Sequence, residues 1–161
     1  MHANVLKSVC NIVLGTTLLV TAASSFAAEK NALLPAGWTV LPKEKSSQDG
    51  LVAIEGFFTS PKVKTKAILI ENKIEGKYGL AVTMPTNQTA KIIQTFKDIS
   101  PNPPSLSVIK AGKYHPTCHP EVTKCDAFVV KNQAIGFAFD ESSAQIIYFD
   151  KNKFHAVFVA D

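Results

Sequence analysis

The chain has 161 residues, of which 46% are hydrophobic and 19% are charged, and its formal net charge is +4 at pH 7. This length suits one domain of ordinary size, so no second domain is needed to bury the hydrophobic residues. All 17 basic residues are lysine. Because the planar guanidinium of arginine is the group that best fits phosphates and guanine edges, this composition argues against nucleic acid as a partner.

The first 27 residues have the three parts of an export signal. Lys7 gives a positive start, residues 9–20 form an apolar stretch, and Ser25 and Ala27 place small residues before a cleavage point. The apolar stretch is shorter than the roughly 20 residues with which a helix crosses a bilayer. We therefore predict that the signal peptide, residues 1–27, is removed. Residues 28–161 are then a single mature domain, periplasmic or secreted, with no membrane span.

The predicted mature chain opens with a strand at residues 37–42, where Trp38 is expected to anchor the strand rather than stack on a ligand. Short runs rich in Val, Ile and Phe follow, separated by Gly, Pro, Asn and Lys clusters, which is typical of an antiparallel β protein. Residues 89–99 fit a helix face about as well as a strand, and we favour a strand. The other runs in this part, all predicted strands, are residues 51–59, 66–71 and 78–84.

Pro101, Pro103 and Pro104 predict a break in regular structure and the start of a connection that can hardly pair along its length. Beyond it, residues 134–139 alternate bulky with small side chains, so one side is nearly bare, and we expect another strand or sheet to cover it. Four closely spaced runs predict a meander: residues 127–130, 134–139, 144–149 and 154–160.

These elements together predict a mainly β fold. We expect a single antiparallel β domain, a meander of sandwich-like or propeller-blade-like architecture, with one disulfide bond.

Cys118 and Cys125 are the cysteines of the predicted mature chain, and they lie in a dense cluster of reactive side chains. In an oxidising compartment such a pair more often forms a disulfide than a metal site. We therefore predict a structural Cys118–Cys125 disulfide, no metal and no cofactor, with Tyr114, His115 and His119 as candidate surface-binding residues. The alternative is a metal-binding envelope protein that uses the thiolates and imidazoles between His115 and Cys125 for zinc or copper.

Ser142, Ser143 and His155 supply the residue types of a serine hydrolase. No Gly-x-Ser-x-Gly sequence surrounds either serine, and residues 140–143 have the polar composition of a connection between strands. We therefore predict a protein that is not an enzyme, with a serine hydrolase as the less favoured alternative.

Four short motifs lie along the mature chain: Asp-Gly-Leu-Val-Ala at residues 49–53, Gly-Lys-Tyr-Gly-Leu at residues 76–80, Gly-Lys-Tyr at residues 112–114, and the ending at residues 142–161. On these motifs the chain resembles small exported bacterial proteins related to FG-GAP or VCBS-type repeat modules. The resemblance implies a calcium-binding loop at residues 46–50, in which Asp49 is the one carboxylate. It implies no particular activity.

Export, small size, many strand edges and the lack of a catalytic set favour a protein-binding module of the cell envelope, of inhibitor or immunity type. We expect its exposed strand edges or its proline-rich connection to bind another envelope or secreted protein.

Overall fold

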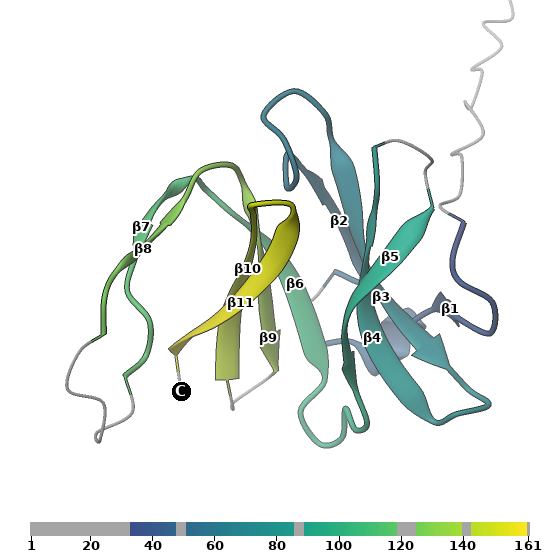
Figure 1. Ribbon diagram of the computed structural model, residues 1–161. Helices are drawn as coiled ribbons and strands as arrows, with labels where there is room; N and C mark the ends of the chain where they lie inside the picture. Colours follow the sequence, from purple (N-terminus) through teal and green to yellow (C-terminus); the bar gives the residue numbers. More distant parts are fainter. Residues whose placement is uncertain (1–32, 48–50, 86–88, 119–124, 140–142, 161) are drawn as a thin grey trace, which may run out of the picture. The chain divides into compact units, whose positions relative to one another are not determined.

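The computed structural model describes residues 33–47, 51–85, 89–118, 125–139 and 143–160 (Figure 1). These residues belong to one unit, Asn31–Asp161. The predicted signal peptide and the predicted calcium position Asp49 lie outside the described residues. In the part of the chain that is described, no helix has the length and apolar character needed to cross a membrane.

The first sheet has five antiparallel strands and is built around β3 (Thr65–Asn72). Two short strands, β1 (Thr39–Val40) and β2 (Ala53–Gly56), pair with successive parts of one edge of β3. On its other edge β3 pairs with β4 (Lys77–Thr83), and β4 pairs with the outer strand β5 (Ala90–Phe96). Of the segment that we favoured as a strand, residues 89–99, the part Ala90–Phe96 is a strand.

The second sheet has four antiparallel strands in the order β11-β10-β9-β6 (Figure 1). A separate two-stranded ribbon pairs β7 with β8, and one 3₁₀ turn, η1, follows β1. The bounds of these elements are η1 Lys43–Lys45, β6 Pro104–Ile109, β7 Gly112–Tyr114, β8 Phe128–Val130, β9 Ala134–Phe139, β10 Ser143–Asp150 and β11 Lys153–Ala160.

The main core lies between the two sheets. Leu69 and Leu80 of the first sheet and Phe137 of the second are almost completely buried in one cluster. The ring of Phe96 on β5 lies 5.6 Å from that of Phe137 and 5.3 Å from that of Phe139. Each buried side chain of this size stabilises the fold by about 1.5 to 3 kcal/mol relative to its exposed form, so this contact holds the sheets together.

The nearly bare side of β9 is covered by the β7–β8 ribbon. Val130 of the ribbon packs in one buried cluster with Ala134 of β9 and Ile146 of β10, and Phe128 packs against this cluster. A Cβ atom at Gly136 would clash with the Ser107 side chain of β6. Small residues on this face of β9 therefore leave room for the ribbon and for β6, as the alternation of residues 134–139 predicts.

The prediction of an unpaired connection after Pro101 is wrong in its second half. Residues Pro104–Ile109 form β6, which pairs with β9 along its whole length. The sheet tolerates Pro104 because it is the first residue of a strand at the sheet edge, where a missing N–H breaks no ladder.

The predicted four-run meander is correct only for its last three runs. Strands β9, β10 and β11 pair in sequence, but β8 pairs with β7 and not with β9. The prediction had no strand at residues 112–114, and without β7 the nearest partner for β8 in the sequence was β9.

Candidate functional site

The outer edge of β11 is the first candidate site, because β11 pairs with β10 on one side only. Lys151 and Asn152 have φ angles of 48° and 63° and make the two-residue turn between these strands. In such a hairpin the residues flanking the turn, Asp150 and Lys153, form a hydrogen-bonded pair, and the direction of the backbone groups then alternates. The N–H and C=O groups of Phe154, Ala156 and Phe158 therefore point away from β10.

One contact confirms this direction. The backbone N–H of Thr117 donates to the carbonyl oxygen of Phe158 at 2.8 Å, from outside the sheet. Within the described residues, the outward backbone groups of Phe154 and Ala156 have no such partner. The side chain of Phe158 is 50% exposed, and Ala156 is also exposed. An open, apolar strand edge of this kind is a template for another strand.

The predicted disulfide between Cys118 and Cys125 is present, with an S–S distance of 2.06 Å. Both sulfur atoms are then bonded to each other, so neither thiolate is free to hold a metal ion. His119 lies outside the described residues and His115 is exposed. Among the described residues, no group of three or more His, Cys, Asp or Glu side chains is placed to hold a metal ion.

Tyr114, the third candidate surface residue, has contacts within the ribbon. Its hydroxyl donates to the carbonyl oxygen of Lys110 at 2.7 Å, and its ring lies 6.1 Å from that of Phe128. Phe128 in turn stacks on Tyr148 at 5.3 Å, and Tyr148 stacks on His155 at 5.3 Å. These rings fix the ribbon to the second sheet, which gives Tyr114 a structural contact in addition to its partial exposure.

The structure does not bring Ser143 and His155 together. Ser143 lies opposite Phe139 at the start of β10, whereas His155 lies opposite Tyr148, five positions further along β10. At a rise of about 3.3 Å per residue, this separation is roughly 16 Å along the sheet, far beyond a hydrogen bond. Ser142 lies outside the described residues.

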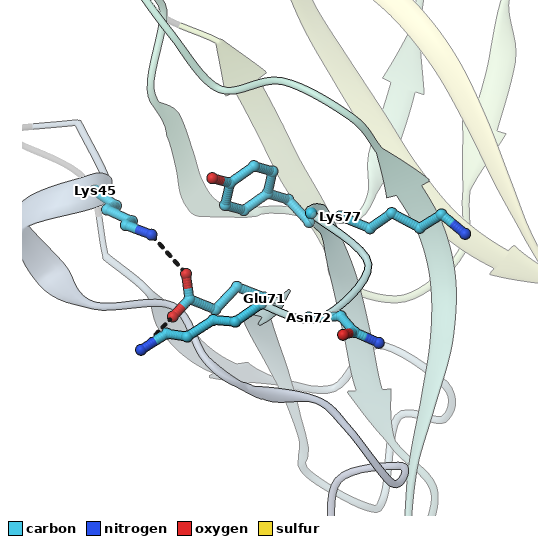
Figure 2. Close-up of a pocket in the computed structure, with 7 residues that line it drawn as sticks. Lys45, Glu71, Asn72 and Lys77 are labelled. Carbon is cyan, nitrogen blue, oxygen red and sulfur yellow. Dashed lines mark hydrogen bonds and ion pairs between the residues drawn. The ribbon is translucent and has the colours of Figure 1, made fainter.

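A second candidate site surrounds Glu71, at the end of β3. The Glu71 side chain is only 2% exposed, and its Oε2 accepts a hydrogen bond from Lys45 Nζ at 2.7 Å. Lys73 Nζ lies 3.4 Å from the other oxygen, Oε1, which accepts no hydrogen bond. Figure 2 shows the carboxylate facing Lys45 of η1, while the side chain of Lys77 points away from it.

These charges shift each other's pKa. The hydrogen bond from Lys45 lowers the pKa of Glu71 below its usual value, although burial of the carboxylate acts in the opposite direction. The same hydrogen bond raises the pKa of Lys45. Glu71 therefore stays ionised near neutral pH in spite of its burial.

The Glu71 group lines a hollow of about 170 Å³. Its other walls are formed by Lys45, Asn72, Lys73, Gly76, Lys77 and Tyr78. The carboxamide oxygen of Asn72 accepts the N–H groups of Ile74 and Glu75, both at 3.1 Å, which fixes the turn beside the hollow. An adjoining hollow of about 360 Å³ shares Lys45 and Tyr78 and is also lined by Glu44, Ile99, Ser100, Pro101 and Pro103.

Sequence reasoning missed the Glu71 site. The signal for it was a charged residue directly after the apolar residues Ala67 to Ile70 of a strand. A carboxylate that continues such a run is either at the surface or paired, and the structure shows it paired. Its partner Lys45 comes from a turn 26 residues earlier, which no local pattern connects to it.

The remaining predicted residues have local structural contacts. Trp38 packs partly buried beside Leu34, Ala53 and Ile92 on the outer face of the first sheet, which is the anchoring position expected for it. Ser46, from the implied calcium loop, is buried, and its hydroxyl donates to the carbonyl oxygen of Lys43 at 2.8 Å.

No protein-family model, curated protein or solved structure matches this chain. The resemblance to FG-GAP or VCBS-type modules therefore stays a prediction from short motifs, and function has to be argued from the two candidate sites.

Proposed function

We propose that this chain is an exported, non-enzymatic protein of the cell envelope that binds another protein, and that it does so by accepting an extended segment along the outer edge of β11. The observation that carries the proposal is the open pair of outward backbone groups at Phe154 and Ala156, beside the exposed ring of Phe158. Strand addition of this kind is a recurrent mode of peptide recognition, in which main-chain hydrogen bonds give affinity and alternate side chains give specificity.

The edge sets what the bound segment must look like. A strand added to β11 would extend the sheet β11-β10-β9-β6 by one strand. Its side chains would alternate between the face of Ala156 and Phe158 and the face of His155 and Val157. Each new backbone hydrogen bond contributes about 0.5 to 1.5 kcal/mol net, so two to four of them contribute about 1 to 6 kcal/mol. Because association itself costs several kcal/mol, side-chain contacts such as those with Phe158 have to supply the rest of the affinity.

The test compares two substitutions at Ala156. Ala156→Pro removes an outward N–H without breaking a bond to β10, whereas the control Ala156→Thr keeps that N–H and suits a strand. The chain, expressed in full and purified from cells, is immobilised and exposed to envelope extract, and each captured protein is then titrated as purified material against the three variants.

We expect saturable binding by the wild type and by Ala156→Thr, and at least a tenfold loss with Ala156→Pro, which corresponds to about 1.4 kcal/mol. Equal binding by all three variants would overturn the assignment of the site to the β11 edge. Failure to recover any saturable partner would overturn the proposed function.

A further inference from the structure

The Glu71 carboxylate is unevenly bonded. Oε2 has a short charge-assisted hydrogen bond from Lys45, but Oε1 has only the Lys73 ammonium at 3.4 Å and accepts no hydrogen bond. A carboxylate that is 2% exposed loses most of its hydration, and each buried oxygen without a hydrogen bond is costly. Oε1 can therefore accept a further hydrogen bond, and the negative charge of the carboxylate favours a cationic donor.

The two lysines hold this carboxylate with different strength. Lys45 is 41% exposed, donates at 2.7 Å, and its ammonium also lies 5.7 Å from the centre of the Tyr78 ring. Lys73 is 72% exposed, and its ion pair with Oε1 is longer. The Lys73 ammonium stays largely in solvent and makes no hydrogen bond to Oε1, so a donor that does make one can displace it.

We propose that this hollow binds an arginine side chain of another protein, whose guanidinium donates to Glu71 Oε1 in place of the Lys73 ammonium. A guanidinium carries several N–H donors in one plane and is less strongly hydrated than an ammonium, so it gains more at a buried carboxylate. A lysine of a partner would offer the same group that Lys73 already supplies from within the chain.

The surroundings fit such a ligand. Tyr78 lines the hollow, and its ring already lies near one cation, Lys45. The adjoining hollow, with Ile99, Pro101 and Pro103 in its walls, offers an apolar surface for the residue next to the arginine. Because all 17 basic residues of this chain are lysine, a second copy of the chain cannot provide the guanidinium. The proposal concerns a site separate from β11, so either proposal can fail without the other.

The test uses N-acetyl-arginine-methylamide as the probe, with N-acetyl-lysine-methylamide as the matched cation. Amide chemical shifts of the full-length protein are followed at physiological salt, which screens long-range charge. The variants are Lys73→Ala, which removes the competing ammonium, and Lys77→Ala as its control. Lys77 lines the same hollow but pairs with Glu75 at 2.8 Å.

We expect the arginine probe to shift the amides of Glu71, Lys73 and Tyr78, and to bind more tightly than the lysine probe. Removal of the competing Lys73 ammonium should tighten binding to Lys73→Ala about two- to fivefold, while Lys77→Ala stays close to the wild type. Glu71→Gln, scored only on folded protein, should lose the response. The proposal is overturned if Lys73→Ala binds the arginine probe no more tightly than the wild type, or if the lysine probe binds equally well.

Discussion

The backbone N–H of Thr117 donates to the carbonyl oxygen of Phe158 at 2.8 Å, so the segment that leads into Cys118 lies against the last part of the β11 edge. The edge is thus divided into a covered end at Phe158 and an open stretch at Phe154 and Ala156. Exposed strand edges invite unwanted pairing, and a covering loop is one way in which proteins limit it. The disulfide ties this covering segment, which follows β7, to Cys125, shortly before β8.

The open stretch consists of the outward groups of Phe154 and Ala156, and proline substitutions test this orientation directly. Ala156→Pro removes an N–H that points away from β10, so we expect it to change the free energy of unfolding by less than about 1 kcal/mol. Val157→Pro, one position along, removes a ladder bond to Ile146 and should cost about 2 kcal/mol or more. Urea unfolding of both variants measures the difference, and equal losses would mean that the assigned direction is wrong.

Removal of the disulfide should destabilise the protein and release the covering segment. Cys118 and Cys125 are 7 positions apart, and closing so short a loop contributes about 2 to 3 kcal/mol in the chain-entropy account. For the Cys118→Ser, Cys125→Ser double variant we expect a loss of this size in urea unfolding and faster hydrogen exchange at the Thr117 amide. Unchanged exchange at Thr117 would show that its bond to Phe158 does not depend on the disulfide.

The packing of β6 beside β9 depends on a small residue at Gly136. A Cβ atom there would clash with the Ser107 hydroxyl and lie 3.0 Å from the end of the Ile109 side chain. We expect Gly136→Ala to lower the free energy of unfolding by about 1 to 3 kcal/mol through overpacking. In the double variant with Ser107→Ala, part of this loss should return, because the nearest clashing atom is gone. Additive losses in the double variant would count against this contact as the cause.

The strands that were predictable from the sequence are those with continuous apolar or alternating runs. β3, β4, β9, β10 and β11 all contain such runs, and the structure has them within a residue or two of the predicted bounds. β6 was missed because its proline signal outweighed the alternation after Pro104. Pairing across the chain was missed for a different reason: the ladder of β6 with β9 joins segments about 30 residues apart, and local periodicity carries no information on such pairs.

The candidate sites were predictable only in part. The pairing of Cys118 with Cys125 follows from an oxidising compartment and from the presence of two cysteines in the predicted mature chain. The open edge at Ala156 instead depends on which residues of β11 direct their backbone groups outward, and the two-residue turn sets this. Glu71 could be recognised as a charged residue after an apolar run, but its burial depends on Lys45 in a distant turn. Contacts between residues far apart in the sequence therefore determine where the Glu71 site forms.

Glu71 should give the protein a defined acid sensitivity. The hydrogen bond from Lys45 lowers the folded-state pKa of Glu71 below its ordinary value, so the unfolded chain binds a proton at this position more readily than the folded one. The stabilisation is therefore fully present above the unfolded-state pKa and is lost as the pH falls through the folded-state pKa. The measurement is the free energy of unfolding in urea, followed from neutral pH down to about pH 3.

Two substitutions separate Glu71 from Asp150, which among the described residues is the other carboxylate with a lowered pKa. Asp150 is also shifted downward, by its hydrogen bond with Lys131, but this pair is more exposed to solvent. We expect Glu71→Gln to flatten the acid limb of the stability curve, since the variant has no proton to gain there. Asp150→Asn should leave most of the limb in place, because solvent screens an exposed pair. If the loss of stability at low pH remains in Glu71→Gln and disappears in Asp150→Asn, then Asp150 and not Glu71 causes the acid sensitivity.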